Sequence, residues 1–251
     1  LAYSFLLKII INSICTLYFT NKFFLLKLNL NFFSKKIAIK IFKKAFFYQV
    51  GRFNEIIHSN LDNIIINSFI GPISVVVYSI TSKAAILFSR LIPSKLTASL
   101  YPFLTELFEK KEIKKLKEIL NILFFISLRF GFFLFLSIVF FNEEFIEIWV
   151  GNDFFGGMNL NFVFGIFILI EILYSVPFAF LLSFGEYKKW SFYSLVEGIS
   201  NIVLSIFLIQ YLSILGVALA TVISRILLTF SFVLIRSLNN LNVNKTFFLK
   251  N

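Results

Sequence analysis

Four ionisable side chains lie within eleven residues of a stretch that is otherwise apolar enough to enter a membrane: Arg52, Glu55, His58 and Asp62. At 100° per residue, one polar stripe of a helix about 100° wide would carry Arg52, Glu55, Ser59, Asp62 and Asn63. Ionisable groups at membrane depth are costly, so they normally face a bundle interior or a wet cavity. The stripe therefore predicts a site that holds an ion or a charged ligand.

A second group of polar residues lies in the apolar stretch 73–101. Lys83 and Arg90 fall within about 60° of each other on a helix, together with Ser79, Ser94 and Thr97. Pro93 removes a backbone donor and predicts a kink. Further single charges in apolar segments are Arg129, Glu171, Glu197 and Arg225.

The composition places the chain in the membrane class. Its 251 residues are 59% hydrophobic and 15% charged, whereas a soluble domain has about a quarter charged residues. The single Cys15 excludes a disulfide framework and a cysteine-based metal site. The first residue is Leu1 rather than Met, so we expect a portion of a longer chain.

A hydropathy window of about 19 residues predicts seven spans, near 1–20, 46–68, 73–101, 119–141, 159–183, 191–210 and 215–235. Alternate connections carry seventeen Lys and Arg on one side and none on the other. This asymmetry predicts a multi-pass protein of the cell membrane, with the C-terminus in the cytoplasm and Leu1 outside. It also explains the net charge of +11, so nucleic-acid binding is not expected.

The predicted fold is an all-α, polytopic bundle in four parts. They are an isolated span at 1–20, a basic cytoplasmic connection at 21–44, a six-helix lobe at 45–236 and a tail at 237–251. Within 35–47, apolar residues occupy one helical face and lysines the other, which is typical of a helix lying in the membrane interface. Six spans after such a connection are typical of one lobe of a two-lobed transporter.

Motifs for catalysis or nucleotide binding are absent. The chain has no phosphate-binding Gly-Lys loop, no GxSxG and no HExxH, and only two Asp. His58 is the only histidine. It is either a proton-relay residue or, more simply, a hydrogen-bonded polar residue of the bundle. We therefore expect no enzyme activity and no cofactor beyond a coupling Na⁺ or H⁺.

Five segments carry a combined pattern. They are DNIIINSFIGPISVVVYS from Asp62, YPFLTELFEKKEIKKLKE from Tyr101, EIWVGNDF from Glu147, FGEYKKW from Phe184 and GVALATVISR from Gly216. In their order over residues 45–236 they resemble the oligosaccharide-flippase (Wzx-like) branch of the MOP superfamily. It implies alternating access for a polyprenyl-diphosphate-linked oligosaccharide, with the chain as the C-terminal lobe. It also implies membrane lipids, a polysaccharide polymerase and glycosyltransferases as partners.

The chemistry of the substrate gives the charged residues their expected roles. A pyrophosphate is an anion that Arg and Lys bind in a low-dielectric cavity, and the candidates are Arg52, Lys83, Arg90, Arg129 and Arg225. A buried carboxylate titrates readily or coordinates a cation, and the candidates are Asp62, Glu55 and Glu197. The alternative is that these charges pair with one another and only join helices, as Arg52 and Glu55 could.

Two other functions stay open at this point. A MATE-like exporter of amphipathic cations, coupled to H⁺ or Na⁺, would share the fold, but its cavity should be acidic rather than basic. A membrane enzyme such as a polymerase or ligase acting on lipid-linked glycans would need a large external loop. The longest predicted external segment, 142–158, has only 17 residues.

Overall fold

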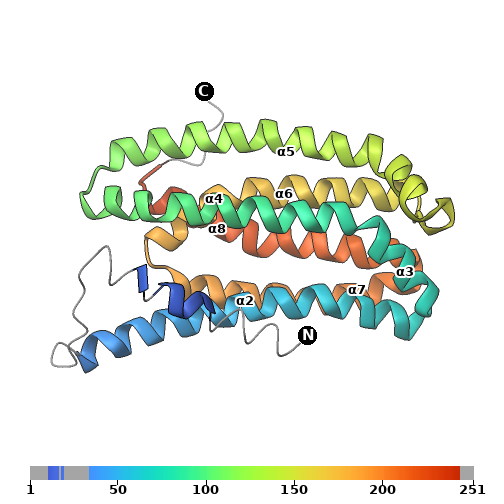
Figure 1. The fold of residues 1–251 in the computed structure, drawn as a ribbon, viewed down its shortest axis with the longest axis horizontal. Helices are drawn as coiled ribbons and strands as arrows, with labels where there is room; N and C mark the ends of the chain where they lie inside the picture. The colour runs from blue at the N-terminus through green and yellow to red at the C-terminus, as the bar shows by residue number, and fades with distance from the viewer. Residues whose placement is uncertain (1–10, 17, 20–33, 244–251) are drawn as a thin grey trace. The chain divides into compact units, whose positions relative to one another are not determined.

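The computed structural model describes residues 11–16, 18–19 and 34–243, without the side chains of 53–59 and 152. All regular structure in this part of the chain is helical (Figure 1), which confirms the predicted all-α class. The elements are α2 (Lys35–Phe69), α3 (Pro72–Thr81), α4 (Lys83–Glu109), α5 (Ile113–Val150), the short η2 (Asn152–Phe154), α6 (Met158–Ser183), α7 (Tyr187–Ser224), the π-helical η3 (Arg225–Phe230) and α8 (Ser231–Asn240).

Several of these helices are long and apolar enough to cross a membrane. They are α5, α6 and the stretch Tyr187–Asn240, and a fourth is obtained when the bent pair α3 and α4 counts as one span. The stretch Tyr187–Asn240 has 54 residues, which would extend about 80 Å as one straight helix. That is more than twice the hydrocarbon thickness of a bilayer, about 30 Å.

The chain reverses direction inside α7, which divides this long stretch into two antiparallel passes. Ser213 has φ 54° and ψ −141°, outside the helical range. Three polar pairs join residues that lie the same number of positions before and after residue 211 in the sequence. They are Asn201 with Thr221, Glu197 with Arg225, and Glu186 with Arg236. The structure thus places a turn within the predicted connection 211–214.

The α3–α4 span is broken at Ser82, where the two helices bend by 49°. α4 continues through Pro93 without a break, so the kink expected at Pro93 stays a prediction. The break is stabilised by one side chain and one backbone group from other parts of the chain. The Thr81 carbonyl accepts a hydrogen bond from Asn142 Nδ2 at 2.9 Å, which satisfies a backbone group that the broken helix leaves open. The Thr81 hydroxyl accepts a hydrogen bond from the Gly156 N–H at 2.8 Å, which joins the end of α3 to the segment before α6.

The chain separates into two compact units, Leu1–Lys43 and Lys44–Asn251. In the first unit, residues 11–16 and 18–19 are helical, and most of the predicted first span and basic connection lies outside the described residues. α2 runs without a break from Lys35 to Phe69, so the segment 35–47 joins the following span directly. Its place in the membrane interface, and the four-part division of the chain, stay predictions.

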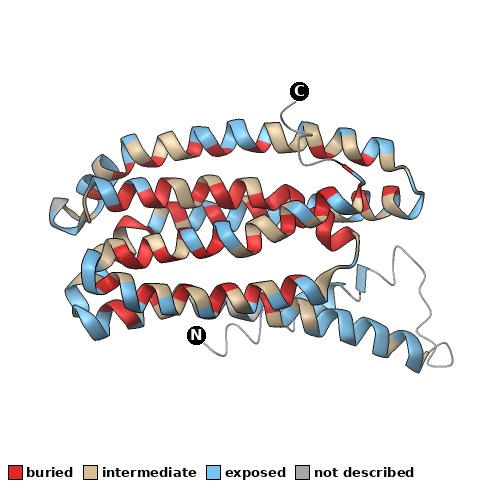
Figure 2. Ribbon diagram, turned by 180° about the vertical axis from the view of Figure 1, so that it is seen from behind, coloured by how far each residue is buried: buried red, intermediate tan, exposed pale blue. Residues whose placement is uncertain are grey.

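α6 is the central helix of the second unit. In its most apolar window 72% of the residues are buried, against 22% for α5, and Figure 2 shows the same contrast. α6 packs against α4, α5, α7 and α8. Because α6 contacts four other helices, a polar side chain on α6 can bind to several helices at once.

α2 packs against α7 at a glycine. A Cβ atom on Gly51 would lie 2.3 Å from Trp190 Cζ3, so no larger residue fits without displacing the buried indole ring. The Ser194 hydroxyl donates to the Gly51 carbonyl at 3.3 Å, and the Tyr48 ring lies 5.7 Å from the Trp190 ring. This close approach positions the α2 residues that follow, including Asp62, against the bundle.

Candidate functional site

A layer of polar side chains surrounds Asp62 inside the helix bundle. Asp62 is 7% exposed, and its Oδ2 accepts hydrogen bonds from Tyr78 at 3.0 Å and Thr221 at 3.4 Å. Asn201 donates to the Thr221 hydroxyl at 2.8 Å and accepts from Ser205 at 3.1 Å. We call these five residues the Asp62 layer; they come from α2, α3 and both passes of α7.

One oxygen of this layer has no partner. Asp62 Oδ1 is buried without a hydrogen bond from any described residue. An ionised carboxylate that is desolvated and only half satisfied is unfavourable in a low-dielectric interior. A proton or a cation bound at Oδ1 would remove that penalty, so the layer has the chemistry of a small-cation or proton site.

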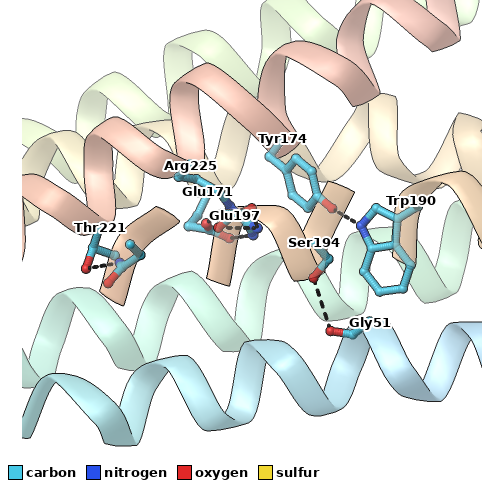
Figure 3. A network of polar contacts seen from close by, with 9 residues as sticks. Gly51, Glu171, Tyr174, Trp190, Ser194, Glu197, Thr221 and Arg225 are labelled. Carbon is cyan, nitrogen blue, oxygen red and sulfur yellow. Dashed lines mark hydrogen bonds and ion pairs between the residues drawn. The ribbon is translucent and has the colours of Figure 1, made fainter. Parts of the chain in front are cut away.

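A buried ion cluster, the Arg225 triad, lies one helical turn away from the Asp62 layer. It consists of Arg225, Glu171 and Glu197. Arg225 Nε and Nη2 donate to the two oxygens of Glu171 at 2.6 and 3.0 Å, and Nη1 donates to both oxygens of Glu197 at 3.3 Å. All three residues are buried. The triad joins α6, the first pass of α7 and η3 (Figure 3).

Aromatic rings continue from the triad toward α2. The Arg225 guanidinium lies 4.3 Å from the centre of the Tyr174 ring, within the range of a cation–π contact. The Tyr174 hydroxyl accepts a hydrogen bond from Trp190 Nε1 at 2.8 Å, and Trp190 packs on Gly51. The charge cluster and the α2 contact are therefore connected by a continuous set of buried side chains (Figure 3).

A second ion cluster lies at the lysine-rich end of the bundle, which the sequence predicts to be cytoplasmic. Glu186, in the α6–α7 turn, accepts from Arg236 at 2.7 Å and from Lys189 at 2.9 Å. Partial burial alone would raise the pKa of the Glu186 carboxyl, but the hydrogen bonds and charges of Lys189 and Arg236 outweigh it and lower the pKa. Glu186 thus stays ionised at neutral pH and holds α8 to the turn.

Two of the predicted anion-binding residues lie on an exposed face of α4. Lys83 and Arg90 are both exposed, as is Ser94 beside them, and we call these three residues the cationic face. Arg52 of α2 is also exposed. Arg129 is exposed on the side of α5 opposite the buried Ser127 and Gly131, so the structure does not bring Arg129 together with the cationic face.

The structure brings together residues to which we had given separate roles. Arg225, an anion-binding candidate, is paired with Glu197, an ion-coupling candidate. The polar stripe of α2 also divides, since Asp62 is buried while Arg52 is exposed. The side chains of Glu55 and His58 lie outside the described residues.

Several residues of the polar layers were not among the predicted site residues. They are Tyr78, Glu171, Asn201, Ser205 and Thr221. A signal for part of this set is present in the sequence. Glu197, Asn201 and Ser205 recur every four residues, as do Thr221 and Arg225, which puts each set on one helical face.

A comparison with solved structures identifies the fold. The chain is similar to a structure described as a MOP superfamily transporter from Pyrococcus furiosus, with a TM-score of 0.70 and 14% sequence identity. The match covers 81% of this chain and 45% of that chain, so this chain spans about half the length of the solved transporter. The description of that protein states that the reversed polarity of its binding pocket suggests a different function.

Sequence comparisons add nothing to this match, because no protein-family model and no curated protein matches the chain. Over the matched part, the chain therefore has the fold of about half of that solved structure, which confirms the predicted fold class.

The Arg225 triad generates a prediction about stability. Arg225→Met leaves two buried carboxylates without their guanidinium, which should lower the free energy of unfolding by about 3–5 kcal/mol. The triple variant Arg225→Met/Glu171→Gln/Glu197→Gln should recover most of this loss. Thermal unfolding of the purified chain in detergent measures both. Arg129→Met, at an exposed position of α5, is the control and should behave like the wild type. An Arg225→Met variant as stable as the control would contradict the pairing.

Proposed function

We propose that this chain is the lobe of a membrane transporter that moves a polyprenyl-diphosphate-linked oligosaccharide across the cell membrane by alternating access. In this account its C-terminus is cytoplasmic and its product serves surface polysaccharide synthesis. The proposal rests on the cationic face of α4, which presents two positive charges at membrane depth without burying them.

The position of the cationic face supports a role in anion binding. Charged groups within a span normally face protein or water rather than lipid. The residues from Pro72 to Tyr101 include no Asp or Glu, so the helix itself offers no partner for Lys83 or Arg90. A second lobe facing α4 would enclose these charges in a cavity, as in transporters built from two repeats. Lys83 and Arg90 lie two helical turns apart, about 10 Å, and a diphosphate offers one phosphate group to each of these long side chains.

The contrast with the Arg225 triad strengthens the assignment. Arg225 is held by two carboxylates inside the lobe, whereas Lys83 and Arg90 are exposed. The lobe thus separates a cation that joins its helices from cations that remain available to a ligand. A MATE-like exporter of cations would require the opposite charge on this face.

We further propose that Asp62 couples transport to Na⁺ or H⁺. Its unpartnered Oδ1 supplies the negative ligand. The Thr221 hydroxyl and the Asn201 side chain, joined to each other at 2.8 Å, add neutral oxygen atoms nearby. Because these groups come from three different passes, binding a cation there would favour the arrangement in which α2 is close to both passes of α7.

Binding of undecaprenyl diphosphate to the purified chain in lipid nanodiscs tests the role of the cationic face. Lys83→Ala/Arg90→Ala should raise the Kd at least tenfold, about 1.4 kcal/mol, because both charges that contact the diphosphate are lost. Lys95→Ala is the matched control, since Lys95 is exposed on the same helix but points about 120° or more away from the other two. The control should bind like the wild type.

Two outcomes would overturn this assignment. One is equal affinity of the wild type and the double variant for undecaprenyl diphosphate. The other is an equal loss in Lys95→Ala, which would indicate nonspecific attraction to a basic helix. Tight binding of the lipophilic cation tetraphenylphosphonium in place of the diphosphate would favour the exporter.

Ion coupling is tested by the thermal stability of the same preparation. The unfolding temperature of the wild type should rise when Na⁺ replaces choline at constant ionic strength, or when the pH is lowered if the coupling ion is H⁺, because ligands that bind only the folded state stabilise it. Asp62→Asn, which keeps an acceptor for Tyr78, should lose whichever of these stabilising responses the wild type shows. Glu144→Gln, at an exposed position of α5, should keep them. Identical responses in wild type and Asp62→Asn would refute the role of Asp62.

A further inference from the structure

Three tyrosines from three helices meet at the lysine-rich end of the bundle. Tyr48 comes from α2, Tyr101 from α4 and Tyr187 from the start of α7, and all three are half-buried. The hydroxyls of Tyr101 and Tyr187 lie 2.9 Å apart, and the rings of Tyr48 and Tyr187 meet edge to face with centres 6.2 Å apart. We call these residues the tyrosine cluster.

The cluster does not have the arrangement of ordinary membrane anchors. Tyrosines of an interfacial belt place their rings among the lipid headgroups. Here the rings and hydroxyls of Tyr48, Tyr101 and Tyr187 are directed at one another across helices. The Lys44 ammonium lies 5.9 Å from the centre of the Tyr187 ring, so a cation accompanies the aromatic surface.

The chemistry of the cluster fits a sugar. A pyranose ring presents a face of C–H groups and a rim of hydroxyls, and tyrosine likewise combines an apolar ring with a polar tip. When two hydroxyls share one hydrogen bond, only one of their two hydrogens lies in it. The Tyr101–Tyr187 pair therefore retains one O–H donor and several acceptor lone pairs, while the partly exposed rings offer apolar surface.

The cluster also lies along the same helix as the cationic face. Tyr101 follows Arg90 by eleven residues of α4, about 16 Å at the rise of an α-helix. Successive positions on this side of α4 are Lys83, Arg90, Ser94 and Tyr101, which fall within about 40° of one another. A ligand with its diphosphate at Arg90 would therefore reach Tyr101 with the sugars that follow the one bonded to the diphosphate.

We propose that Tyr48, Tyr101 and Tyr187 form a saccharide-contact site that binds the first sugars of a lipid-linked glycan at the lysine-rich end of the lobe. The proposal rests on the proposed function and deepens it, because it assigns the glycan and the diphosphate to different side chains. Loss of the glycan contact and loss of the diphosphate contact can therefore be measured separately.

The test compares two probes, undecaprenyl diphosphate and an undecaprenyl-diphosphate-linked trisaccharide, on the full chain in lipid nanodiscs. The wild type should bind the glycosylated lipid at least tenfold more tightly. Tyr101→Leu/Tyr187→Leu should bind both lipids equally, with its Kd for bare undecaprenyl diphosphate within twofold of the wild-type value. Lys83→Ala/Arg90→Ala should raise the Kd for both lipids by the same factor and leave the preference for the glycosylated lipid unchanged.

The hydroxyl-deleted variant Tyr101→Phe/Tyr187→Phe keeps the rings and guards against misfolding of the leucine variant. It should reduce the preference for the glycosylated lipid at least threefold. The proposal is overturned if the wild type binds the two lipids with equal affinity, or if both tyrosine variants keep the preference for the glycosylated lipid. It is also overturned if both variants lose affinity for the two lipids by the same factor. Failure of bare undecaprenyl diphosphate to bind the wild type would instead contradict the proposed function itself.

Discussion

A guanidinium enclosed by apolar helices must keep its carboxylates, and the packing of the lobe depends on this constraint. Arg225 is bonded to Glu171 on α6 and Glu197 on α7, so η3, the central helix and the first pass of α7 cannot separate without exposing a charge in a low-dielectric interior. Removing one partner of such a cluster is far more costly than the cluster is stabilising. The triad thus favours one arrangement of these three elements.

The polar groups of the bundle are of two kinds. Some have hydrogen-bond or ionic partners on other helices, and some do not have them among the described residues. The triad and the ring of Tyr174 satisfy Arg225. Asp62 retains one oxygen that no described residue partners, and Lys83 and Arg90 remain exposed. The proposed transporter would use both kinds of group, because its helices would move as a unit while ligands and ions bind to groups that are not already saturated. The proposed roles follow this division.

Much of the fold was predictable, because hydropathy and lysine distribution define where the chain enters and leaves an apolar layer. The turn at Ser213 lies within the predicted connection 211–214. The pairing of Glu171 with Arg225 was not predictable, since the two residues are 54 positions apart. The break at Ser82 was not predicted, because Asn142, which binds the Thr81 carbonyl there, comes from α5 and lies 61 positions away. Helical periodicity grouped Asp62 with Arg52, but only neighbouring helices decide that Asp62 is buried.

Solvent accessibility of the cationic face in intact membranes tests the central claim most directly. In a Cys15→Ser background, Lys83→Cys and Arg90→Cys are treated with a membrane-impermeant methanethiosulfonate and compared with Phe133→Cys and Phe140→Cys. These two positions are also exposed, on α5. We predict labelling at 83 and 90 and none at 133 and 140, because the α4 face borders water and the α5 face borders lipid. Equal protection of all four positions would contradict a hydrated anion path along α4.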